Sequence, residues 1–319
     1  MEASWWMWAL FNVLVLGMLA LDLGVFHRNS HAVRAKEAAI WTVVWIVIAL
    51  IFGAFLYWWR GPDTAMEYIT GYLVEKSLSA DNIFVFVLIF TYFAVPAQYQ
   101  HRVLFWGVLG ALVMRGMFIG LGAALLARFH WIIYVFGAFL VFTGIKLLTQ
   151  KEESIDPGQS PVLAFVRRIF PVTEGYEGSL FFVRRNGVLM ATPLFVVLAL
   201  VESSDVMFAV DSVPAIFAIT QDPFIVYTSN VFAILGLRSL YFLLADVLGK
   251  LRYLKYGLSI ILAFVGTKML VSGFVHVPPA LSLGFIVAVL TVTVAASLLV
   301  PERESEAAAE VVMYRDRYH

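Results

Sequence analysis

Long apolar segments alternate with short polar segments along most of this chain. Nine of the apolar segments have about the 20 residues that an α-helix needs to cross the hydrocarbon of a bilayer. They cover residues 5–26, 38–59, 67–93, 103–127, 131–149, 190–218, 224–247, 255–274 and 279–300. This pattern predicts an all-α, polytopic transmembrane helical protein with about nine spans.

The composition agrees with this prediction and narrows the possible functions. Of the 319 residues, 61% are hydrophobic and 14% are charged, whereas a soluble domain has about half apolar and a quarter charged residues. The formal net charge is zero, so nothing indicates a nucleic-acid partner. The chain has no cysteine, which excludes disulfides, thiolate metal sites and thiol catalysis.

Basic residues predict how the chain crosses the membrane. Most of the 22 Lys and Arg fall in alternate loops, with a large group between residues 146 and 185. Cytoplasmic loops retain Lys and Arg, so we expect the amino terminus outside and the carboxyl terminus in the cytoplasm.

Two groups of three spans resemble each other. SADNIFVF (79–86) aligns with SSDVMFAV (203–210), RGMFI (115–119) with RSLYF (238–242), and FTGIKLL (142–148) with FVGTKML (264–270), at offsets of 124, 123 and 122 residues. A near-constant offset indicates an internal repeat. Because three spans are an odd number, the two copies have opposite orientations, and inverted repeats of this kind are common in transporters.

The repeat predicts five regions of the chain. They are an N-terminal two-span region (1–66), a first three-helix repeat (67–149), a cytoplasmic loop (150–189), a second three-helix repeat (190–274), and a last span with a charged cytoplasmic tail (275–319). Within the loop, the apolar run 162–170 with two arginines is typical of a helix at the membrane surface.

The first span of each repeat carries acids in the middle of its apolar sequence. The segments are EKSLSADN (75–82) and VESSDVMFAVDS (201–212). A carboxylate inside a bilayer costs about 2.5–3.5 kcal/mol and normally faces a polar cavity or an ion pathway. We therefore predict a metal site formed by six side chains: Glu75, Asp81, Asn82, Glu202, Asp205 and Asp211.

Oxygen ligands limit the choice of ion. All six histidines lie in loops or at span ends, including the closely spaced His27 and His31. The embedded oxygens disfavour zinc and copper and suit magnesium, calcium or manganese. Carboxylates that converge without a metal repel one another, so protonation on metal release is expected and proton-coupled exchange follows as a hypothesis.

Helix geometry leaves two arrangements of the acids open. On an ideal helix Asp81 lies about 120° from Glu75, and Asp211 lies equally far from Asp205. Either the acids serve two sites, or the helices unwind locally. Pro214 favours unwinding near Val210, because proline clashes with the carbonyl four residues before it.

Three other interpretations remain. The acids can form buried ion pairs with Lys76, Arg115 and Arg238 that fix the helix register. An intramembrane aspartyl hydrolase also uses paired carboxylates, but no GxGD segment is present. A membrane assembly factor would use the acids for structure alone.

The segments EKSLSADNIFVF, VESSDVMFAVDSVPAIFA and SNVFAILGLRSLYFLL resemble the TerC integral membrane family, in particular its Alx-like members. The resemblance implies an inner-membrane protein that exports divalent metal, chiefly manganese, with Mn²⁺ as the transported ion and no cofactor. It also implies metal-handling roles for Glu75, Asp81, Glu202, Asp205 and Asp211. The expected function is therefore export of Mn²⁺ in exchange for protons, and no enzyme activity is expected.

Overall fold

The structure, a computed structural model, describes residues 4–24, 35–149, 160–185, 187–244, 253–275 and 277–299. Side chains of residues 21–24, 35, 80 and 81 also lie outside the description. His27, His31, residues 150–159 of the predicted loop and the predicted tail from residue 301 fall in the parts that are not described.

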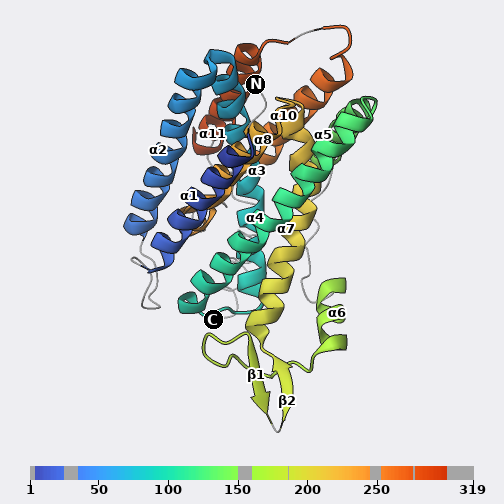
Figure 1. The fold of residues 1–319 in the computed structure, drawn as a ribbon. Helices are drawn as coiled ribbons and strands as arrows, with labels where there is room; N and C mark the ends of the chain where they lie inside the picture. Colours follow the sequence, from blue (N-terminus) through green and yellow to red (C-terminus); the bar gives the residue numbers. More distant parts are fainter. Residues whose placement is uncertain are drawn as a thin grey trace.

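A bundle of helices forms most of the described chain (Figure 1). Nine helices and one bent helix pair, in chain order, correspond to the nine predicted spans and to the predicted helix in the loop. They are α1 (Trp5–Gly24), α2 (Ala35–Arg60), α3 (Pro62–Tyr92), α4 (Ala97–Arg128), α5 (Ile132–Thr149), α6 (Pro161–Ile169), α7 (Pro193–Phe217), the pair α8 (Pro223–Leu235) and α9 (Leu237–Leu244), α10 (Leu254–Leu270) and α11 (Pro279–Leu299).

Length and hydropathy identify candidate membrane spans among the described helices. Helices α2, α4, α5, α7 and α11 each qualify alone, and the pair α8–α9, bent by 43°, qualifies as a sixth span if it is counted as one. The predicted class, a polytopic helical membrane protein, is confirmed.

Apolar and charged side chains are distributed as in a protein that is surrounded by lipid. Large apolar residues such as Leu16, Val47, Phe142 and Val292 lie on the outside of the bundle, whereas charged residues such as Arg115 lie inside it. In water the exposed apolar side chains would be unfavourable, but in a bilayer they face acyl chains. The polar interior is therefore the place to look for function.

Helices α5 and α10 cross closely and run antiparallel. A Cβ atom on Gly137 would lie 2.9 Å from the carbonyl oxygen of Gly266, and one on Gly144 would lie 2.9 Å from that of Ser259. Residue numbers increase along α5 from Gly137 to Gly144, while those of the contacted residues decrease along α10 from Gly266 to Ser259. Small residues permit this approach of two backbones, as in many membrane helix pairs.

A small domain extends from one end of the bundle (Figure 1). It contains α6, which confirms the predicted helix over 162–170, and an antiparallel hairpin of β1 (Phe182–Arg185) and β2 (Val188–Ala191). The predicted loop therefore contains a hairpin, for which Asn186-Gly187 between two apolar runs is a strong sequence signal. The Tyr176 hydroxyl donates to the Phe93 carbonyl oxygen at 2.7 Å and joins this domain to the end of α3. Burial raises the pKa of Tyr176 to about 12, so the hydroxyl remains a donor.

Candidate functional site

A charged cluster lies inside the bundle where α3, α4 and α7 meet. Glu75 of α3 is completely buried and forms an ion pair with Arg115 of α4. Arg115 also donates from Nη1 to the Ser212 hydroxyl of α7 at 2.9 Å. Asp205 of α7 is buried and interacts electrostatically with the same arginine. Three helices thus bring two acids to one base.

The sequence of α7 explains why Asp205 and Ser212 face this cluster. They are seven residues apart, which is close to two helical turns, so both side chains emerge on one face. Glu202, three residues before Asp205, lies on the adjoining part of that face and interacts electrostatically with Asp205. The cluster therefore contains three acids and Arg115.

Glycine in α4 makes room for the Glu202 carboxylate. A Cβ atom placed on Gly110 would overlap both carboxylate oxygens of Glu202. One turn away, a Cβ on Gly107 would lie 3.1 Å from the Val201 side chain. The absence of side chains at these two positions lets α7 approach α4, with the acid between them.

Asp211 lies on a different face of α7. It is half-buried and interacts electrostatically with Lys146 of α5, not with Arg115. For α7, the structure has Asp205 and Asp211 on separate faces of a continuous helix, and the Asp81 side chain of α3 lies outside the description.

The predicted unwinding near Pro214 is wrong. Helix α7 continues through Pro214 to Phe217. Proline lies in the last turn, so its missing N–H removes a bond only near the helix end, and the Pro214 carbonyl still accepts from Ala218 N–H at 3.0 Å. The interrupted span is instead α8–α9, which bends at Gly236.

Two buried amides have unpaired polar atoms. Among the described residues, Oδ1 of Asn82 and both polar atoms of the Asn230 side chain have no hydrogen-bond partner. Buried polar groups are nearly always paired with protein or water, so these amides are suited to a polar ligand. The Asp81 side chain lies outside the description, although its backbone belongs to α3.

The described side chains contain no group of three or more Asp, Glu or His residues that could hold a metal ion. Of the six predicted ligands, Glu75 and Asp205 interact with Arg115, Glu202 interacts with Asp205, and Asp211 interacts with Lys146. Asn82 is buried on α3. The metal site remains a prediction, and one of its acids, Glu75, has an arginine partner, as the ion-pair interpretation expects.

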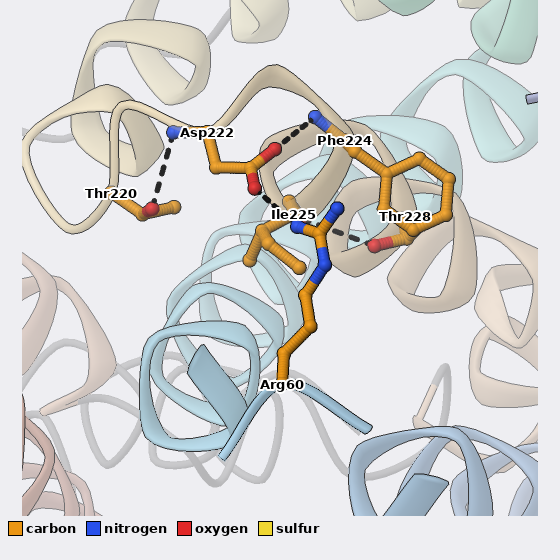
Figure 2. Close-up of polar contacts among 6 residues, drawn as sticks. All are labelled: Arg60, Thr220, Asp222, Phe224, Ile225 and Thr228. Carbon is orange, nitrogen blue, oxygen red and sulfur yellow. Dashed lines mark hydrogen bonds and ion pairs between the residues drawn. The ribbon is translucent and has the colours of Figure 1, made fainter. Parts of the chain in front are cut away.

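A second polar cluster, which the sequence did not indicate, lies at the junction of α7 and α8 (Figure 2). Arg60, the last residue of α2, contacts the Asp222 carboxylate at 2.5 Å. The other Asp222 oxygen caps α8 by accepting from Phe224 N–H at 2.9 Å. Asp222 before Pro223 is a recognisable helix start, but nothing local in the sequence connects it to Arg60.

The N-terminal part of α3, which follows Arg60 in the chain, makes a related set of contacts. Glu67 shares a side-chain hydrogen bond with Thr220 and interacts electrostatically with Lys268 of α10. Lys268 in turn donates to the Ser282 hydroxyl of α11 at 3.1 Å. These contacts connect elements of both predicted repeats at one end of the bundle.

An apolar exterior around charged side chains on long helices defines an integral membrane protein of several spans. A model of the family described as "Integral membrane protein TerC family" matches residues 60–305. The chain belongs to the TerC family, and the predicted resemblance is confirmed.

Relatives match over most of their lengths. A Myxococcus xanthus protein described as "Uncharacterized membrane protein STKORF319" is 54% identical over 92% of each chain. The "Putative membrane-bound redox modulator Alx" of Escherichia coli K12 is 50% identical over 90% of this chain and 92% of its own. A Rickettsia bellii membrane protein is 40% identical over 92% of this chain and 97% of its own. No solved structure matches the chain.

Proposed function

We propose that this protein exports divalent metal ions, Mn²⁺ in the first place, from the cytoplasm across the inner membrane in exchange for protons. The observation that carries the proposal is the acidic surplus inside the bundle. Glu75 and Asp205 interact with Arg115, and Glu202 adds a third acid through its electrostatic interaction with Asp205. Anionic oxygens buried on membrane helices are costly and typically belong to ion pathways.

The ligand chemistry supports a hard divalent cation as substrate. Carboxylates and neighbouring amides or hydroxyls supply only oxygen, the donor that manganese, calcium and magnesium prefer. Manganese is chosen over calcium because of the family resemblance. Residues proposed to bind it are Glu75, Asp81, Asn82, Glu202, Asp205 and Asp211.

Proton exchange follows from the same carboxylates. A metal binds carboxylates only in their ionised form, so binding releases protons and proton binding opposes metal binding. Arg115 would hold the metal-free cluster together by its contacts with Glu75 and Ser212.

The antiparallel crossing of α5 and α10 supports the inverted repeat. In the repeat alignment Gly144 corresponds to Gly266 and Gly137 to Ser259. The observed contacts, Gly137 with Gly266 and Gly144 with Ser259, are therefore each other's equivalents. Two copies related by a two-fold axis between α5 and α10 make such reciprocal contacts.

The description of relatives as redox modulators suggests a second function. In this chain a thiol–disulfide mechanism is ruled out, because it contains no cysteine. A redox effect shared with those relatives would be a consequence of metal transport, since manganese itself is redox-active in cells.

Manganese efflux from intact cells tests the proposal. Asp81→Asn and Asp205→Asn should abolish efflux while protein abundance stays near that of the native chain. Asp63→Asn, which changes an exposed acid in the first turn of α3, is the matched control and should export normally. If both variants are present at much lower abundance and the remaining protein still exports manganese, the acids serve as structural ion pairs and the proposal is wrong.

A further inference from the structure

Lys76 occupies an unusual place for a basic side chain. It lies in the middle of α3, about 21 Å along the helix axis from the first residue at a rise of 1.5 Å per residue. A lysine near a helix end extends its amine to the membrane surface, but this position is too far from either end. The amine must therefore be satisfied within the bundle.

The amine of Lys76 lies at the break between α8 and α9. Its Nζ donates to the Ala233 carbonyl oxygen at 3.2 Å. A Cβ atom on Gly236, the residue at the bend, would lie 2.8 Å from the same nitrogen. Glycine at the bend thus leaves space that the ammonium group fills.

Neighbouring charges do not account for this placement. The adjacent Glu75 is directed to Arg115. Arg238 of α9 contacts His101 Nε2 at 3.2 Å. Among the described side chains, Lys76 forms no ion pair with a carboxylate. Among the described groups, the partner of its charge is the Ala233 carbonyl at the end of α8.

The carbonyl end of a helix attracts cations. Its last four carbonyls lack the N–H partners of a continuing helix, and the aligned peptides give this end a partial negative charge. In transporters with broken helices, such carbonyls coordinate small cations at membrane depth. An ammonium group can take the same place because it carries the same charge and donates to the same oxygens.

We propose that the carbonyl end of α8 is a binding position for a monovalent cation, and that the Lys76 ammonium occupies it as a tethered cation. This position is separate from the acids around Arg115 and does not depend on the proposed manganese export. Without the Lys76 ammonium, a free sodium or potassium ion is expected to bind at the same carbonyls.

Thermal unfolding of the purified full-length protein tests this assignment. Melting temperature is measured in choline, sodium and potassium chloride at equal ionic strength. Lys76→Ala should melt lower than the native chain in choline, and sodium or potassium should restore part of the loss in a saturable way, because a ligand that binds only the folded state stabilises it by mass action. The native chain and Lys76→Arg should melt alike in all three salts.

A second variant keeps the test decisive if Lys76→Ala does not fold. Lys76→Ser also removes the ammonium group and leaves its place open, so it should show the same dependence on sodium or potassium. Folded Lys76→Ala or Lys76→Ser protein with equal melting temperatures in the three salts would overturn the proposal, whatever the outcome for manganese.

Discussion

Helices α3 and α7 both carry acids within their apolar sequences, yet the surroundings of these acids differ. Glu75 of α3 is completely buried and contacts Arg115 directly. On α7, Asp205 shares that arginine from the other side, Glu202 fits against Gly110, and Asp211 faces Lys146. Glu75 has a base as its contact partner, whereas Glu202 of α7 has another acid, Asp205, as its electrostatic neighbour.

This difference separates two roles that the sequence alone assigned to one site. A buried ion pair contributes little net stability, but removal of one partner is strongly destabilising. Glu75 is therefore expected to influence stability most, and Glu202 to influence ion binding most. The following variants test that division.

Arg115→Met should have the largest effect on stability. It leaves Glu75 and Asp205 without their base, at a cost of about 3–5 kcal/mol. The free energy of unfolding or the melting temperature in detergent measures the loss. Arg128→Met, at the exposed end of the same helix, is the control and should unfold like the native chain.

Adding Glu75→Gln to Arg115→Met should restore much of the lost stability, because the buried charge is then removed together with its partner. If the double variant is no more stable than Arg115→Met, Glu75 is not the charge that Arg115 neutralises.

Gly110→Ala should have an intermediate effect. The added methyl group overlaps the Glu202 carboxylate, and overpacking of this kind costs about 1–3 kcal/mol. Displacing Glu202 should also weaken Mn²⁺ binding, measured by titration calorimetry on purified protein. Gly120→Ala, which meets open space, should bind Mn²⁺ as the native chain does. Equal affinities for both variants would remove Glu202 from the site.

Changes at Asp222 should have a smaller effect. Asp222→Ala removes both the cap of α8, worth about 0.5–2 kcal/mol, and the contact with Arg60. Asp222→Asn retains an oxygen for the cap and loses only the charge, which is worth about 0–1 kcal/mol for a partly exposed pair. Thermal unfolding should therefore place Asp222→Asn between Asp222→Ala and the native chain. The opposite order would show that the ion pair outweighs the cap.

Single cysteines test whether α3 and α7 cross the membrane in opposite directions. These substitutions should have no cost in stability. Gln98 and Gln221 are both exposed, and the native chain has no cysteine. Charge distribution predicts position 98 in the cytoplasm and position 221 outside. An impermeant thiol reagent added to cells with a permeabilised outer barrier should label position 221 and spare position 98. Labelling of both, or of position 98 alone, contradicts the inverted repeat.

Much of the fold was predictable from the sequence because membrane helices depend on local hydrophobicity. In the described part of the chain, each predicted apolar segment lies largely on one helix or on the bent pair α8–α9. The break at Gly236 was not predicted because single glycines are also frequent within continuous membrane helices. The unwinding predicted at Pro214 was wrong because the sequence does not show how far this proline lies from the end of α7.

The candidate site was less predictable because its contacts are long-range. The spacing of Asp205 and Ser212 placed them on one face, but only the packing of α4 against α7 brings Arg115 between α3 and α7. Likewise, Gly110 and Arg60 act on residues far away in the chain, and one sequence carries no signal for such pairs. The hairpin of β1 and β2, in contrast, has a local sequence signal in Asn186-Gly187.

Coupled transport in vesicles tests the central claim most directly. Purified protein is reconstituted into liposomes that contain a pH-sensitive dye, and Mn²⁺ is added outside. If Mn²⁺ enters in exchange for protons, the interior becomes alkaline as manganese accumulates. Asp205→Asn vesicles and protein-free vesicles should show neither change, and excess calcium added with Mn²⁺ should compete weakly. Manganese uptake without a change in internal pH would contradict proton exchange, and uptake no greater than in protein-free vesicles would contradict the proposed transport of manganese.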